Sequence, residues 1–187
     1  MTMMGRNKGK AFERHIAKDI LKAFPSFTPR DCYRTPMSGG HPFADSGDLC
    51  ISPDLQKLFP FVVECKHYRN FRFQDVLPPT KQFITWVFQA RTAAAQMDRP
   101  WLLVVRGNNT PVYVLAGAET CREVRELQGY LREGTTCIHH SWWMTLTGPP
   151  GRCYLVARWP DFLAWWVDVS AGKHAKKRTY VASKRPK

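Results

Sequence analysis

The sequence contains no long apolar run. None of its 187 residues lies in a stretch approaching the roughly 18 uncharged apolar residues that a membrane helix requires, so we expect no membrane association. The first residues, MTMMGRNKGKAFERH, lack the apolar segment of a secretory signal. This absence predicts a cytoplasmic protein of a bacterial, archaeal or virus-infected host cell.

Paired cysteine motifs are also absent. Six cysteines are scattered without a C-x-x-C pair, and several lie in apolar runs where a thiol acts as a small hydrophobic side chain. We therefore expect reduced, structural cysteines. The segment CIHH, residues 137–140, contains metal-ligating residue types, but without a partner cluster it favours a polar strand end over a metal site.

Acidic residues are scarce. The chain has 28 Lys and Arg against 15 Asp and Glu, and this formal charge of +13 predicts an anionic partner, most often nucleic acid. Seven of the basic residues and no acid lie in KHAKKRTYVASKRPK, residues 173–187. We interpret this segment as a flexible basic arm that holds phosphate nonspecifically, with a solubilising terminus as the alternative.

Apolar periodicity predicts an α/β fold with a mixed β-sheet flanked by helices. The pattern indicates helices over 8–24, 80–97 and about 119–132, and strands within 32–38, 48–52, 60–67, 100–107 and 111–118. We expect one domain over 1–172, consisting of a core at about 5–117 and an aromatic-rich extension at about 118–172, followed by the basic tail.

The run FVVECKH places two opposite charges inside a predicted strand. Because side chains alternate between the faces of a strand, Glu64 and Lys66 share one face. If PDLQKLF forms a turn centred near Gln56, antiparallel pairing of the flanking strands sets Asp48 opposite Glu64. Two carboxylates and an ammonium group are then expected at one place.

Close carboxylates repel each other unless a cation neutralises them, and a hard divalent cation prefers oxygen ligands. We predict Mg²⁺ held by Asp48, Glu64 and the backbone carbonyl of Cys65. A bound metal makes water more acidic, and Lys66 can orient that water, which suits phosphodiester hydrolysis. The alternative is an ion pair in which Lys66 bridges the two acids on a solvated face, but the apolar residues preceding Glu64 favour a core strand, where unneutralised charge is costly.

An ordered set of motifs carries a family resemblance over about residues 5–117. It comprises GRNKGKAFERHIAKDI with Glu13 at the edge of the buried helical stripe, SGG with Ser38, SGDLCI with Asp48, VVECKHY with Glu64 and Lys66, and WVFQARTAAAQ followed by PWLLVVRG. In these pieces the sequence resembles the PD-(D/E)XK nuclease superfamily, and most of all its archaeal-type Holliday junction resolvases and their phage relatives.

The resemblance implies a restriction-endonuclease-like fold and a homodimeric endonuclease that cuts opposing strands of four-way DNA junctions. It also implies dependence on Mg²⁺, with Mn²⁺ as a substitute, and no organic cofactor. Asp48 and Glu64 would hold the metal, and Lys66 would assist the attacking water. Glu13 would position water or a second metal, and Ser38 would lie beside the scissile phosphate.

The sequence departs from the family pattern at three places. Gly47 stands where the superfamily name has proline before the aspartate. Asp45 is an additional acid that competes for the role given to Asp48. The region beyond about residue 118 exceeds a minimal resolvase, which leaves substrate choice and dimer geometry open.

Further DNA contacts are expected from basic and strand-end residues. The candidates are Arg6, Lys8, Lys10, Arg30, Arg34, His67 and Tyr68, each weighed against an ordinary solvated surface residue. Trp142, Trp143, Trp165 and Trp166 are expected in the core or at a dimer interface, with stacking on unpaired bases as the alternative.

Two other functions are consistent with the same sequence. One is a different nuclease on this scaffold, either restriction-like or acting in repair or at replication forks. The other is a non-catalytic basic module that binds nucleic acid. The active-site residues do not separate the nuclease classes, because they contact a phosphate and not the shape of the DNA.

Overall fold

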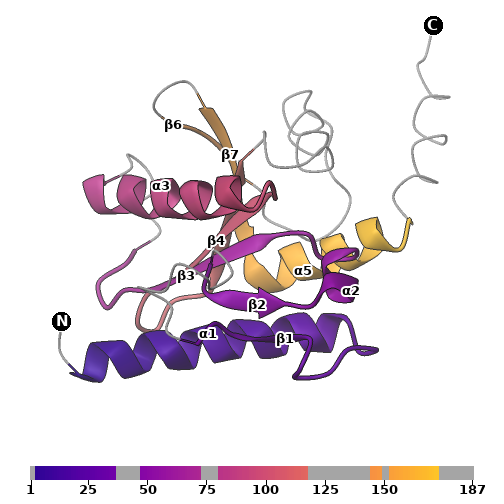
Figure 1. The fold of residues 1–187 in the computed structure, drawn as a ribbon. Coiled ribbons are helices and arrows are strands. Elements are labelled where there is room, and N and C mark those ends of the chain that lie inside the picture. The colour runs from indigo at the N-terminus through magenta and orange to yellow at the C-terminus, as the bar shows by residue number, and fades with distance from the viewer. Residues whose placement is uncertain (1–2, 37–46, 73–79, 118–143, 149–151, 173–187) are drawn as a thin grey trace, which may run out of the picture.

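The computed structural model of the chain describes residues 3–36, 47–72, 80–117, 144–148 and 152–172 (Figure 1). The elements are α1 (Met3–Ala23), β1 (Cys32–Arg34), β2 (Leu49–Ile51), α2 (Pro53–Gln56), β3 (Val62–His67), α3 (Lys81–Gln96), β4 (Trp101–Arg106), β5 (Tyr113–Gly117), β6 (Met144–Gly148), β7 (Arg152–Arg158) and α5 (Trp159–Ser170). This order confirms the predicted α/β class. None of the described helices is long and apolar enough to cross a membrane.

The main sheet has five strands in the order β3-β4-β5-β7-β6, so β3 is an edge strand. β3 runs parallel to β4, whereas each later pair is antiparallel, which makes the sheet mixed as predicted. β1 and β2 form a separate antiparallel pair. The apolar run of β4 is buried from Trp101 to Val105, as expected for a strand covered on both faces.

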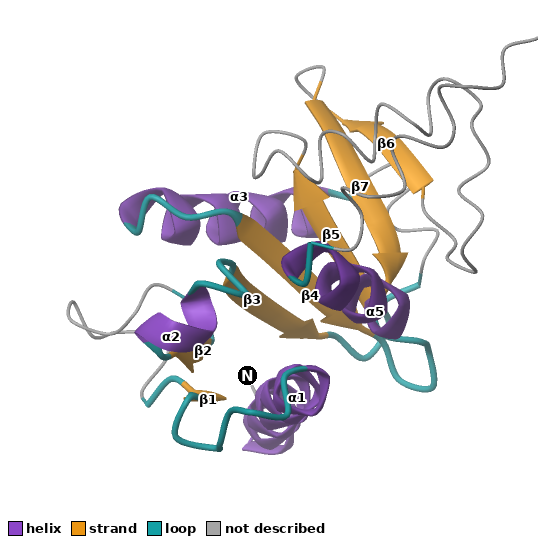
Figure 2. Cartoon of the chain, turned by 90° about the vertical axis from the view of Figure 1, so that its right-hand side faces the viewer, coloured by secondary structure: helices purple, strands orange, loops and turns teal. Residues whose placement is uncertain are grey.

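Helices cover both faces of this sheet (Figures 1 and 2). Odd-numbered residues of β3, such as Val63, pack in one buried cluster with residues of α1 and α5. The other face contributes Val62 to a second cluster with residues of α3. Glu64 and Lys66 are two and four residues after Val62, so strand alternation places them on the α3 face.

The aromatic C-terminal region supplies part of the sheet and of the core. β7 pairs along its length with β5, and α5 buries Phe162 and Trp166 in the cluster that contains α1. The Trp166 indole donates a 2.7 Å hydrogen bond to the Leu58 carbonyl, which confirms that Trp166 is a core residue. Trp165 is half-buried beside it, while Trp142, Trp143 and the expected helix over 119–132 lie outside the described residues.

The predicted turn between β2 and β3 is wrong in detail. Residues 53–56 form the short helix α2, begun by the hydroxyl of Ser52 accepting a hydrogen bond from Leu55 N–H and by Pro53 in the first turn. β2 and β3 therefore belong to different sheets and do not form the expected antiparallel ladder. A backbone hydrogen bond from Asp48 N to Val63 O, 2.9 Å long, connects the end of β2 to β3 instead.

The contribution of the C-terminal helix to stability is testable at Trp166, which is 4 % exposed. Trp166→Ala removes a large buried side chain and leaves the Leu58 carbonyl without its donor, so we expect a loss of about 3–5 kcal/mol in the free energy of unfolding. Urea denaturation measures it. Phe88 on the outer face of α3 is 67 % exposed, and Phe88→Ala should change stability by less than about 0.5 kcal/mol. Equal effects of the two variants would contradict this role of α5.

Candidate active site

Glu64 and Lys66 stand together on the edge strand. The Lys66 ammonium lies 2.6 Å from Glu64 Oε1, and their side chains are 25 % and 13 % exposed, respectively. The predicted shared face is confirmed by this contact. Parallel register sets both residues beside Leu103 and Val105 of β4, so the two charges emerge from an apolar surface.

Asp48 is held against the same strand by its backbone and its side chain. Its N–H donates to Val63 O at 2.9 Å, and its Oδ2 accepts a 2.8 Å hydrogen bond from Cys65 N–H. Its carbonyl accepts from Thr35 N–H on the other side. The carboxylate is therefore fixed alongside residues 63–65, next to Glu64, although the expected strand ladder is absent.

Gly47 makes this approach possible. Its φ is +135°, and a Cβ there would lie 2.9 Å from Val62 Cγ1 and 3.1 Å from Val63 O. Any side chain would both strain the backbone and push β3 away. The glycine that replaces the family proline is thus a close-packing requirement at the residue preceding Asp48.

The carbonyl of Cys65 faces the same side as its N–H. In an extended strand the N–H and C=O of one residue point the same way. Because Cys65 N–H reaches Asp48, the Cys65 carbonyl lies on the free edge of β3 rather than toward β4. This backbone oxygen therefore lies on the edge of β3 along which Asp48 is held, and its role as a metal ligand stays a prediction.

The electrostatics of the site centre on Asp48. Burial and, after it, the nearby charge of Glu64 raise its pKa to about 7, although the hydrogen bond from Cys65 N–H acts in the opposite direction. Glu13 also raises the pKa of Asp48, which places Glu13 within electrostatic reach. A cation bound between Asp48 and Glu64 would remove this penalty on the ionised form.

Glu13 forms an ion pair that sequence reasoning missed. Arg34 Nε donates to Glu13 Oε2 at 2.5 Å, with the two side chains 19 % and 11 % exposed. Arg34, expected to contact DNA, therefore has an acidic partner from α1. Its proximity to Glu13 has no sequence signal, because the two residues come from different elements 21 positions apart.

The remaining candidates do not converge on this cluster. Lys8, Lys10 and Arg30 are exposed, His67 contacts Asn108 Oδ1 at 3.2 Å and the ring of Phe12, and Tyr68 is 49 % exposed. Ser38, Asp45 and the segment 137–140 lie outside the described residues, as does the side chain of Arg6. Their proposed roles stay predictions.

The donors suit a hard divalent ion that needs few protein ligands. Among the described residues, no three His, Cys, Asp or Glu side chains gather as a metal-holding group. Asp48, Glu64 and the Cys65 carbonyl supply oxygens only, and Mg²⁺ commonly binds through one or two carboxylates while keeping several waters. The half-buried pair of acids, of which Asp48 has a raised pKa, fits such an ion.

The sheet, with an acid fixed beside its edge strand and a Glu-x-Lys on that strand, defines an α/β protein of the restriction-endonuclease-like class. A comparison with family models adds the particular family. The model described as "Phage putative PDDEXK endonuclease" matches residues 4–140, and the chain belongs to this family. The matched range includes Glu13, Asp48, Glu64 and Lys66. No curated protein and no solved structure matches the chain.

The raised pKa of Asp48 predicts a pH-dependent stability in the absence of metal. The folded carboxyl holds its proton up to about pH 7, whereas the unfolded carboxyl ionises near 3.8. The folded state thus binds more protons between these values, so this group makes the free energy of unfolding fall as pH rises through that window. Asp48→Asn should remove this contribution and exceed the wild type in stability at pH 8 by about 1–3 kcal/mol.

Urea denaturation in EDTA at pH 5 and pH 8 measures this difference. Asp54→Asn is the matched control, since the Asp54 side chain is 77 % exposed on α2. It should keep the wild-type pH dependence. If Asp48→Asn shows the same change between the two pH values as the wild type, Asp48 does not carry the buried charge.

Proposed function

We propose that this chain is a metal-dependent DNA endonuclease that hydrolyses phosphodiester bonds at the edge of β3. The observation that carries the proposal is the half-buried Asp48 carboxyl, fixed beside Glu64 and Lys66 on an apolar surface. Membership of a phage PDDEXK endonuclease family supports the same chemistry. A structural ion pair would need only one acid for Lys66, whereas here Asp48 also lies within electrostatic reach of Glu64 and Glu13.

The protein's own residues divide the work. Asp48, Glu64 and the Cys65 carbonyl would hold Mg²⁺, which when bound supplies the Lewis acidity that brings the pKa of water toward neutrality. Lys66, whose ammonium lies 2.6 Å from Glu64 Oε1, would orient the attacking water and stabilise the negative charge that develops on the phosphorane. Water adds to phosphorus as the bond to the leaving deoxyribose oxygen breaks.

Glu13 and Arg34 would act beside this centre. The ion pair fixes the Glu13 carboxylate at the side of Asp48, where it can position water or contribute to a second metal site. Ser38 remains a candidate neighbour of the scissile phosphate from the sequence resemblance alone.

For the substrate, we propose branched DNA of the four-way junction type, cut by a homodimer. The support is the ordered resemblance to junction resolvases over about residues 5–117 and the net charge of +13. Symmetric cutting of two opposed strands requires two sites in fixed relation, which a two-fold dimer supplies. A cytoplasmic setting follows from the same proposal.

Removing the site's charges should abolish cleavage without abolishing DNA binding. Asp48→Asn and Glu64→Gln should each lower the cleavage rate more than about 100-fold by weakening the metal site, and Lys66→Ala about 10²–10³-fold by removing charge stabilisation. Asp54→Asn and Lys57→Ala change the same residue types at exposed positions and should cleave normally. Gel assays with Mg²⁺ and electrophoretic mobility shifts in EDTA measure the two effects. Full cleavage by Asp48→Asn or Glu64→Gln would reject a nuclease centred here.

Substrate choice is tested with end-labelled DNA of three kinds: a four-way junction, a linear duplex and a single strand, each with Mg²⁺, Mn²⁺ or chelator. We expect paired, symmetric nicks on the junction only, and none with chelator. Cleavage of duplex at one sequence would favour a restriction-like nuclease, and no cleavage of any substrate would favour a non-catalytic binding module. A monomeric mass by light scattering, both free and on junction DNA, would contradict the dimer.

A further inference from the structure

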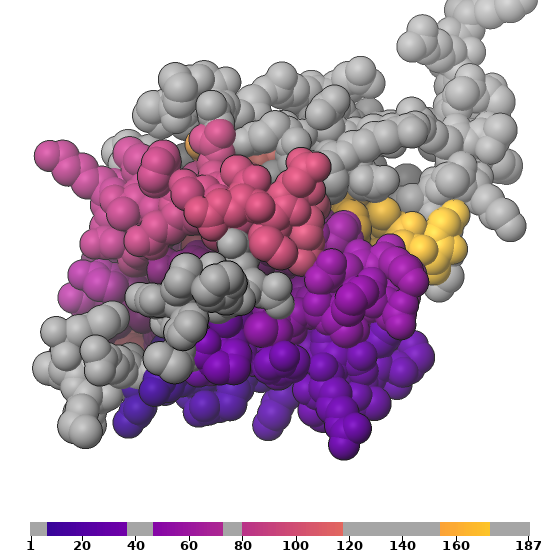
Figure 3. Space-filling view, in the orientation of Figure 1, coloured from indigo at the N-terminus to yellow at the C-terminus, as the bar shows by residue number. Residues whose placement is uncertain are grey.

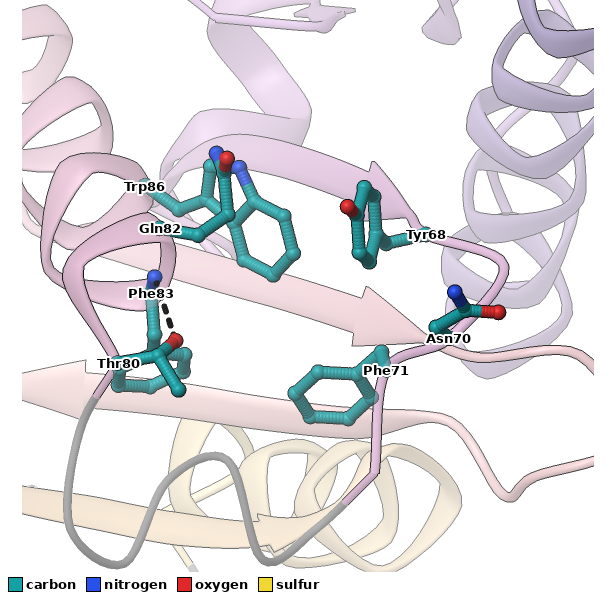
Figure 4. A pocket seen from close by; sticks show the side chains of 7 residues that line it. All are labelled: Tyr68, Asn70, Phe71, Thr80, Gln82, Phe83 and Trp86. Atoms are coloured by element: carbon teal, nitrogen blue, oxygen red, sulfur yellow. Dashed lines mark hydrogen bonds between the residues drawn. The ribbon is translucent and has the colours of Figure 1, made fainter.

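A pocket of about 270 Å³ lies between the end of β3 and the start of α3 (Figure 4). Its floor consists of the buried aromatic residues Phe71, Phe83 and Trp86. Its rim carries the exposed residues Tyr68, Asn70, Thr80 and Gln82. The pocket is thus flat-walled and apolar at the bottom and polar at the mouth. It is smaller than the roughly 300–1,000 Å³ typical of sites for drug-sized ligands.

The pocket begins where the catalytic face of β3 ends. The strand alternation continues to Tyr68, since Tyr68 N–H still donates to Arg106 O of β4, as Val62 N–H does to Pro100 O at the other end. Glu64, Lys66 and Tyr68 therefore follow one another on the same face, about 6.6 Å apart per step. A strand of DNA whose phosphate contacts Lys66 has its neighbouring nucleotide within reach of Tyr68.

The walls match a planar heterocycle. The Tyr68 and Trp86 rings meet edge to face with centroids 5.5 Å apart, so part of the half-exposed Tyr68 ring remains available for stacking. Asn70 and Gln82 offer side-chain amides, each with donors and an acceptor, and neither amide has a hydrogen-bond partner within the ranges that the structure describes. Thr80 is already engaged, since its hydroxyl accepts from Phe83 N–H (Figure 4).

The charge around the pocket suits a ligand attached to phosphate. None of the described residues that line it is a carboxylate, and the exposed Arg69 and Arg72 lie in the same segment as Tyr68. The described lining residues include no cation either, so among them a phosphate group would find no charged partner. A neutral ring suits the uncharged lining of the pocket, and phosphates attached to that ring would lie outside it, near Lys66 and the two arginines.

We propose that this pocket receives one unpaired nucleobase of the DNA strand held at the active site, with Tyr68 stacking on the base and the Asn70 and Gln82 amides contacting its edge. The inference rests on the proposed function, because it takes that DNA strand as the ligand. It adds that the enzyme engages single-stranded or distorted DNA next to the cut, since a base inside a duplex is not accessible to such a pocket.

The test compares two probes in EDTA, where no cleavage occurs: a short labelled oligodeoxythymidylate and a fully abasic oligomer of the same length. Tyr68→Ala should weaken binding of the thymidylate by about tenfold or more, because stacking is lost, and should leave binding of the abasic oligomer unchanged. Tyr68→Phe keeps the ring and should bind as the wild type does. Fluorescence anisotropy measures the binding of each protein to each probe.

Phe88→Ala is the matched control. Phe88 is an exposed aromatic residue on α3, the helix of Trp86, and it is not among the residues that line the pocket. The outer surface of α3 is open to solvent in Figure 3. This variant should bind both probes as the wild type does. Circular dichroism checks that Tyr68→Ala, an exposed substitution, stays folded.

Several outcomes would overturn the pocket assignment. They are unchanged thymidylate binding by Tyr68→Ala, equal losses on the two probes, losses by Phe88→Ala as large as those by Tyr68→Ala, and no binding of either probe by the wild type. If Tyr68→Ala changed the oligomeric mass of the protein and left its DNA affinity unchanged, the pocket would be a protein contact, and the proposed binding of a nucleobase would be rejected. The binding assays are done in EDTA and do not depend on cleavage. A failure of the nuclease proposal would therefore be seen separately, as uncleaved DNA in the assays with Mg²⁺.

Discussion

The fixation of Asp48 beside the edge of β3 is the constraint on which the rest of the site depends. Two hydrogen bonds attach this acid to the backbone of β3: Asp48 N–H donates to Val63 O, and Cys65 N–H donates to Asp48 Oδ2. In an inner strand these backbone groups would be hydrogen-bonded to the neighbouring strand. Only an edge strand has these groups free. The unpaired edge of β3, which in most sheets must be protected, here serves to assemble the site.

The two faces of β3 differ in role: one packs into the core, and the other carries the charged residues of the site. α1 and α5 bury the odd-numbered side chains of β3 in a continuous aromatic and aliphatic core, which keeps the strand rigid. The opposite face holds Glu64 and Lys66 and continues into Tyr68 beside α3. β7 and α5 lie beyond the matched family range of 4–140, yet they supply a sheet strand and core side chains. The core cluster that packs against β3 therefore includes residues outside the matched family range.

Local pattern predicted those features that depend on neighbours in sequence. Alternation fixed the common face of Glu64 and Lys66, and uninterrupted apolar runs identified β3 and β4. Asp48 lies beside Glu64 as predicted, but the reason given for this position was wrong. The predicted antiparallel pairing of β2 with β3 does not form, and residues 53–56 fold into α2 instead. Ser52 and Pro53 were an available signal for the start of this helix. The Glu13–Arg34 pair and the β5–β7 pairing depend on tertiary packing across long separations, which no local periodicity encodes.

Charge balance explains why one site would bind both a divalent ion and DNA. Glu13, Asp48 and Glu64 bring three negative charges, and Arg34 and Lys66 return two, so the metal-free cluster is neutral only while Asp48 keeps its proton. Burial, followed by the charge of Glu64, raises the pKa of Asp48 and favours that protonated state. In the proposed mechanism a divalent ion displaces the proton and leaves one positive charge in excess, which a single phosphodiester neutralises. Metal and substrate would thus stabilise each other, because neither alone balances the cluster.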